Sequence, residues 1–139
     1  MAAAGNKPIF SQTPKTWWVQ GAGTVANTTK DLTTGTIHQV GTAGAQGSRL
    51  DKLIFQALGT NIATVARIWL NNGSATGTAA NNTLVKDVTL AATTNSETAA
   101  IGNTEVALDL VLQTGYKVYV TFGTAVAAGF DVTAAVGDY

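Results

Sequence analysis

The chain has 139 residues, which is enough for one domain with a hydrophobic core. Apolar residues make up 45% of it and charged residues 12%, with eight basic and eight acidic side chains and a formal net charge of zero. This composition excludes a disordered chain, and without clustered Lys and Arg it provides no electrostatic affinity for nucleic acid or for an anionic membrane.

The sequence contains no cysteine, so disulfides and zinc–thiolate sites are excluded. No apolar run approaches the ~18–20 residues that span a bilayer. Residues 1–5 (MAAAG) lack the basic and apolar regions of a signal peptide. We therefore expect a protein made and left in the cytoplasm, or assembled there, with neither nucleic acid nor membrane as a partner.

The N-terminal stretch, residues 1–15, differs from the rest of the chain. It holds both prolines, Pro8 and Pro14, and shows no sustained alternation of apolar and polar residues. Proline fixes φ and removes a backbone donor, which disfavours a place inside a sheet. The sequence predicts an extended N-terminal arm over residues 1–15, followed by one β-domain over residues 16–139.

The first part of this domain is rich in Thr, Val, Gly and Asn, which favour strands and turns over helices. Strands are predicted over residues 16–25, 36–41, 50–58, 62–71 and 83–90. Residues 59–61 have the length of a hairpin loop, and residues 72–82 predict an exposed loop. Residues 91–103 predict a polar connection with room for a short strand, and a helix there is less favoured.

Three further strands follow from alternation with period two. Their core-facing residues are predicted to be Val106, Leu108, Leu110 and Leu112, then Tyr116, Val118, Val120 and Phe122, then Val126, Ala128, Phe130 and Val132. In the second of these strands Lys117, Tyr119 and Thr121 are assigned to the wetter face. About eight antiparallel strands with regularly spaced turns predict an all-β, two-sheet jelly roll or β-sandwich.

The residues that carry catalysis are sparse. His38 is the only histidine, and the eight carboxylates are dispersed along the chain without a DxDxDG run. The segment GAGTVA at residues 21–26 lacks the third glycine of a nucleotide-binding loop. We expect no catalytic residue, no cofactor and no metal, and therefore no enzyme.

The aromatic residues suggest contact with other molecules. Trp69, Tyr116, Phe122 and Phe130 are predicted to fill the core. Trp17 and Trp18 are adjacent, so in a strand they face opposite sides, one toward the core and the other toward the surface or an interface. A platform for stacking sugar rings is the alternative use of an exposed tryptophan. The candidate interface residues are Pro8, Ile9, Phe10, Trp17, Trp18 and Tyr139.

Three segments resemble a group of small virion proteins of tailed bacteriophages. They are residues 57–73 (ALGTNIATVARIWLNNG), residues 80–90 (ANNTLVKDVTL) and residues 115–139 (GYKVYVTFGTAVAAGFDVTAAVGDY). The shared features are a strand carrying ARxxxNNG and a closing GYK…GDY segment that is expected to form a hairpin. The resemblance covers residues 28–139, and its most specific part is the closing segment.

The resemblance implies a jelly-roll head decoration protein, also called a cement protein. Such a protein would bind the outside of the assembled capsid and stabilise it by non-covalent contacts. Its partners would be the major capsid protein and further copies of itself in a homotrimer, and its location the capsid surface of the virion. The alternative is a receptor- or carbohydrate-binding module of the phage tail or fibre.

Overall fold

The computed structural model describes residues 11–139, which form eight strands and one short 3-10 helix. The elements in chain order are β1 (Thr13–Ala22), β2 (His38–Thr42), β3 (Ser48–Ala57), β4 (Thr64–Asn71), η1 (Ala79–Asn81), β5 (Asn82–Leu90), β6 (Thr104–Leu112), β7 (Lys117–Phe122) and β8 (Phe130–Asp138). The predicted all-β class and the predicted number of strands are confirmed.

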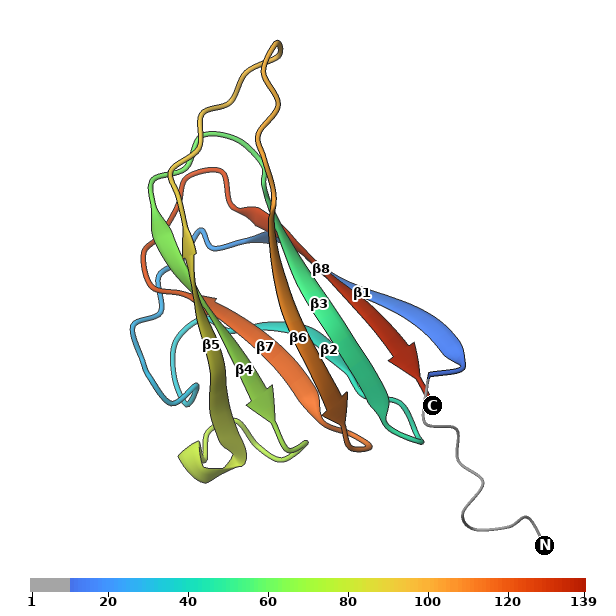
Figure 1. Cartoon of the computed structure of the whole chain (residues 1–139). Coiled ribbons are helices and arrows are strands. Elements are labelled where there is room, and N and C mark those ends of the chain that lie inside the picture. Colours follow the sequence, from blue (N-terminus) through green and yellow to red (C-terminus); the bar gives the residue numbers. More distant parts are fainter. Residues whose placement is uncertain (1–10) are drawn as a thin grey trace, which may run out of the picture.

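The strands form two four-stranded antiparallel sheets packed face to face (Figure 1). Sheet A has the order β1-β8-β3-β6 and sheet B the order β2-β7-β4-β5. Most consecutive strands therefore alternate between the sheets, and only β4 and β5 are both consecutive and paired. Two sheets of four strands connected in this way make a jelly roll, which confirms the predicted architecture.

The main core lies between the two sheets. Strand β3 contributes Leu53 and Phe55, which are at most 1% exposed, because every second residue of the strand points inward. Phe122 of β7 meets Phe55 edge to face at 6.4 Å and stacks on Phe130 of β8 at 5.8 Å. These aromatic contacts connect the sheets at the end where residues 91–103 project (Figure 1).

Two predicted hairpins are wrong. The connection after β3 leads from sheet A to β4 in sheet B, and the connection after β7 leads from sheet B to β8 in sheet A. A loop of a few residues either reverses the chain within one sheet or crosses the roughly 10 Å between two packed sheets. Loop length therefore did not distinguish the two cases.

The ends of the sheet A strands also differ from the prediction. Strand β1 begins at Thr13, so residues 13–15 lie in the sheet, and Pro14 pairs with Gly137 of β8. Pro14 fits there because β1 is an edge strand, where the missing N–H group costs no ladder hydrogen bond. Strand β8 begins at Phe130, so residues 126–129 form the preceding turn rather than a strand.

For two long connections the prediction from the sequence agrees more closely with the structure. The exposed loop predicted over residues 72–82 is confirmed up to residue 81, and it contains the short helix η1. Residues 91–103 contain no strand, and their one ladder contact is a bridge between Thr93 and Asn61.

A second, smaller core lies on the outer face of sheet B. Leu32, from the connection between β1 and β2, packs on Trp69 of β4 and Tyr119 of β7, and all three are at least 93% buried. The indole Nε1 of Trp69 donates to Oγ1 of Thr121 at 3.1 Å. Trp69 is therefore buried outside the main core, and the wetter face predicted for Tyr119 and Thr121 is wrong because residues 23–37 cover it.

Asn27 holds this covering segment in place. Its Nδ2 donates to the carbonyl oxygens of Thr34 and Thr36 at 3.0 and 2.9 Å, and its Oδ1 accepts from the N–H of Thr29 at 3.0 Å. Its own backbone N–H donates to the carbonyl of Phe122 at 2.7 Å. Asn27 thus satisfies several backbone polar groups of a segment without regular structure.

Candidate functional site

The described residues contain no evident centre for acid–base or metal chemistry. Among residues 11–139, no three His, Cys, Asp or Glu side chains lie close enough together to hold a metal ion. Three of the carboxylates instead pair with basic side chains at the surface, namely Asp51 and Asp109 with Arg49, and Glu105 with Lys52. Across the same residues, no helix is long and apolar enough to cross a membrane.

His38, the only histidine, lies at the start of β2 against an apolar neighbour. Its ring meets Phe122 edge-on, with 6.3 Å between the ring centroids. Partial burial disfavours the charged imidazolium and lowers the pKa of His38 below its usual 6.5. The side chain is therefore neutral near pH 7 and packs as a core-edge residue.

The lowered pKa of His38 predicts a loss of stability in mild acid. The unfolded chain takes up a proton near pH 6.5, whereas the folded chain does so at lower pH, so the free energy of unfolding falls as pH decreases through this interval. In His38→Gln this decrease should disappear. The measurement is the urea midpoint of both proteins from pH 7.5 to pH 5. An equal slope in both proteins would contradict the assignment.

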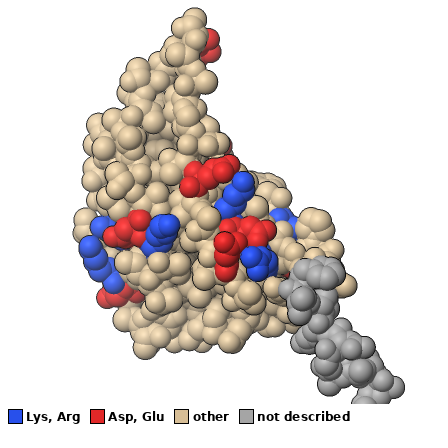
Figure 2. Space-filling view, in the orientation of Figure 1, with Lys and Arg blue, Asp and Glu red and all other residues tan. Residues whose placement is uncertain are grey.

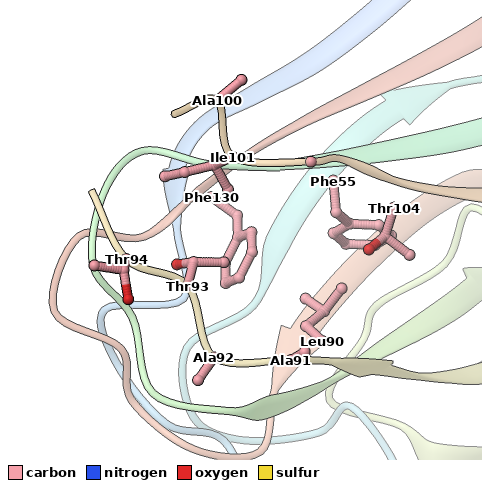
Figure 3. Close-up of a pocket in the computed structure, with 11 residues that line it drawn as sticks. Phe55, Leu90, Ala91, Ala92, Thr93, Thr94, Ala100, Ile101, Thr104 and Phe130 are labelled. Carbon is pink, nitrogen blue, oxygen red and sulfur yellow. The ribbon is translucent and has the colours of Figure 1, made fainter. Parts of the chain in front are cut away.

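One end of the sandwich contains a cavity of about 320 Å³ (Figure 3). Phe55, Leu90 and Phe130 come from three strands of the two sheets, and the connection over residues 91–103 contributes Thr93 and Ile101 (Figure 3). None of the residues that line the cavity is titratable. The lining combines apolar side chains with Thr93, Thr94 and Thr104, and it offers no acid or base.

The outer face of sheet A differs from that of sheet B, because no described segment covers it. Trp18 of β1 points outward and is 68% exposed. The strand registers place Thr133, Ile54 and Glu105 beside it in one row across β8, β3 and β6. Thr133 is the direct neighbour of Trp18 in this row, and Ile54 lies one strand further. An exposed tryptophan is typical of a protein contact surface.

The ion pairs on this face lie on β3 and β6. Arg49 and Lys52 of β3 pair with Asp51, Asp109 and Glu105 at 2.9 to 3.4 Å. Figure 2 shows basic and acidic side chains side by side in small mixed groups, separated by broad uncharged areas. Exposed pairs of this kind add roughly 0–1 kcal/mol each to stability. On β8 the charged residue nearest to Trp18 in the register is Asp131, two residues before Thr133, and its Oδ1 accepts from the N–H of Gly21 at 3.0 Å.

The structure decides between the two adjacent tryptophans. Trp17 points inward and is half-buried over Gly41 of β2, where a Cβ atom would lie 2.1 Å from the indole Cδ2. Only glycine leaves room for the ring at this distance. Trp17 therefore joins the two sheets of its own chain, and Trp18 is the one available for a partner.

The structure places one of the other candidate interface residues, Tyr139, and does not describe the remaining three. Tyr139 is half-buried, and its backbone N–H donates to the carbonyl of Gly47 at 3.2 Å, so it closes the end of sheet A. Pro8, Ile9 and Phe10 lie outside the described residues. Ile54 joins the surface although it was not selected from the sequence. The sequence feature that could have identified Ile54 is the alternation of inward and outward residues in β3. An irregularity between Leu50 and Lys52 interrupts this alternation.

No family model and no curated protein matches the chain. The solved structures that match it include two titled "Structure of infectious bursal disease virus Gx strain" and "Structure of infectious bursal disease virus Gt strain". In each, the match covers 99% of this chain at 15% identity with a TM-score of 0.32. The chain spans 36% of the length of each matched chain. Likenesses this low carry no conclusion about function.

Proposed function

We propose that this chain is a bacteriophage capsid decoration protein, which binds the outside of an assembled head as a homotrimer and stabilises it by non-covalent contacts. The observation that carries the proposal is the asymmetry of the sandwich. The outer face of sheet B is covered by the chain's own residues 23–37, whereas the outer face of sheet A presents Trp18 uncovered by any described residue.

The composition supports the same role. The charged fraction is 12% and the net charge is zero, so contacts depend on shape and apolar burial rather than on electrostatic steering. Trimer formation would place three copies of the Trp18 face on three capsid subunits, and such multivalency strengthens binding without strong single contacts. The resemblance of residues 28–139 to phage virion proteins names the particle on which to test this.

Replacing Trp18 with alanine tests the proposed face. Tryptophans at the centre of interfaces often contribute 2 kcal/mol or more, so we expect binding to purified heads that lack the protein to weaken by roughly 30-fold or more. The measurement is co-sedimentation of the chain with heads over a concentration series. Thermal unfolding of the free chain should change little, because the side chain is 68% exposed.

Ile62→Ala is the matched control, because Ile62 is also apolar and is 60% exposed, but it lies in the connection after β3. This variant should bind heads as the unchanged protein does. Equal binding by Trp18→Ala would exclude the Trp18 face as the capsid contact. Sedimentation equilibrium of the free chain tests the homotrimer separately.

The tail or fibre module is the second candidate, and the exposed ring of Trp18 favours it, because such a ring can also stack on a sugar. The two functions differ in their ligand. Binding of the isolated chain to a glycan array, lost in Trp18→Ala, together with no binding to heads, would favour the tail or fibre module.

A further inference from the structure

Arg67 differs from the other basic residues that form ion pairs. Its side chain is 11% exposed, whereas those of Lys15, Arg49 and Lys52 are 37 to 49% exposed. It lies on β4 in the outer face of sheet B, two residues before Trp69 and opposite Thr121 of β7. Burial of a charged group is costly unless other groups satisfy its donors, so this arginine calls for an explanation.

The donors of Arg67 are incompletely satisfied. Its Nε and Nη1 are closed off from solvent and have no hydrogen-bond partner among the described residues. Among residues 11–139, Asp87 is the one carboxylate paired with it, with Oδ1 at 3.5 Å from Nε, and that carboxylate is 50% exposed. A guanidinium has five N–H donors and no acceptor, so a single carboxylate at this distance leaves most of them free.

The backbone that follows β7 contributes to the burial. Gly123 follows the last residue of β7, and a Cβ atom built on it would lie 3.1 Å from Nη1 and 3.6 Å from Nη2 of Arg67. The guanidinium therefore rests on the bare backbone of this glycine. Nη2 is the guanidinium nitrogen that is not closed off in this way.

A cavity of about 290 Å³ adjoins the guanidinium. Arg67 and Gly123 line it together with Thr64, Thr89 and Thr124. Thr64 Oγ1 already donates to the carbonyl of Thr124 and accepts from its N–H, at 2.9 and 3.1 Å. No hydrogen bond within the described residues uses the hydroxyl of Thr89, which leaves a second donor beside the guanidinium.

We propose that this cavity is a carboxylate-binding site, in which Arg67 and Thr89 hold an acidic side chain of a neighbouring protein subunit. One cation partly compensated by Asp87 suits a single negative charge, and a dianionic phosphate would meet stronger repulsion from Asp87. An anion in the cavity reaches the guanidinium through Nη2, and closure of Nε and Nη1 from water weakens the screening of the delocalised charge, which strengthens this bond. The identity of the neighbour rests on the proposed capsid role; the site itself does not.

Titration of the isolated full-length chain with sodium acetate, at constant ionic strength against sodium chloride, tests the site. The arginine Nε–H signals are followed by NMR, because the closed-off Nε–H of Arg67 exchanges slowly with water. We expect the Arg67 signal to shift and saturate, and Arg67→Gln to weaken the acetate affinity reported by neighbouring amide signals about tenfold or more. Arg49→Gln is the control, since Arg49 is also paired with aspartates but is exposed, and it should leave the titration unchanged.

Thr89→Val keeps the shape and strand preference of the residue, so it tests the site even where Arg67→Gln fails to fold. It should weaken acetate binding by about two- to tenfold. No saturable shift with acetate would overturn the site, and tighter binding of phosphate than of acetate would overturn the carboxylate assignment. Saturable acetate binding with unchanged binding of Arg67→Gln to heads would overturn the neighbouring subunit as the source. The binding of Trp18→Ala to heads tests the proposed function separately, because this variant leaves the Arg67 cavity unchanged.

Discussion

Asn61→Ala is expected to lower the free energy of unfolding by about 3 kcal/mol, because three backbone groups lose their partner. The Nδ2 of Asn61 donates to the carbonyl of Gly129 at 3.0 Å, and its Oδ1 accepts from the N–H groups of Ala128 and Gly129 at 2.8 and 3.1 Å. Asn61 is 2% exposed, so water does not replace these bonds. Urea denaturation followed by circular dichroism measures the effect.

Two further variants make this expectation specific. Asn72→Ala lies in the exposed loop after β4 and should change stability by less than about 0.5 kcal/mol. Asn61→Asp keeps both acceptor bonds but sets a buried carboxylate oxygen against the Gly129 carbonyl, so its destabilisation should be larger at neutral pH than in acid, where the carboxyl is protonated. A change of under 1 kcal/mol in Asn61→Ala would show that the connection before β8 does not depend on this side chain.

Trp69→Ala should have the larger effect, at about 3–5 kcal/mol, because it empties the centre of the second core. Leu32 and Tyr119 lose their main packing partner, and Thr121 loses the hydrogen bond from the indole Nε1. Since residues 23–37 have no regular structure, their attachment depends on this contact and on Asn27. Faster amide hydrogen exchange across residues 23–37, beyond that in the main core, should accompany the loss.

Trp69→Phe and Trp18→Ala separate the causes. The phenylalanine variant keeps an aromatic ring but loses the bond to Thr121, so we expect a loss of about 1–2 kcal/mol. Trp18→Ala removes an equally large but exposed side chain and should change stability by less than about 0.5 kcal/mol. Similar unfolding midpoints for Trp69→Ala and Trp18→Ala would contradict a second core on sheet B.

Strand β7 shows what a sequence pattern can and cannot predict. Period two in the second half of the chain correctly predicted the inward positions of Val118, Val120 and Phe122. It failed for Tyr119 and Thr121, because a residue on the outer face of a sheet is buried or exposed according to what a distant segment covers. Leu32, which lies 87 positions before Tyr119 in the chain, supplies that cover.

The candidate contact surface was likewise predicted only in part from the sequence. Adjacent Trp17 and Trp18 had to face opposite sides once they lay in one strand, and that followed from the sequence. Which of them points inward depends on Gly41 of β2, in the other sheet, which leaves the space that Trp17 fills. The Arg67 cavity likewise depends on Gly123, far along the chain from Arg67.

By itself, the sequence determined the properties that depend on composition and short-range order. These are a low charge with no net excess, an all-β class, about eight strands and the faces within each strand. The tertiary structure alone decided which connections cross between the sheets, where Trp69 is buried and which face of the sandwich stays uncovered. The reason is physical: alternation is a property of neighbouring residues, whereas strand partners and surface cover depend on the packing of residues far apart in the chain.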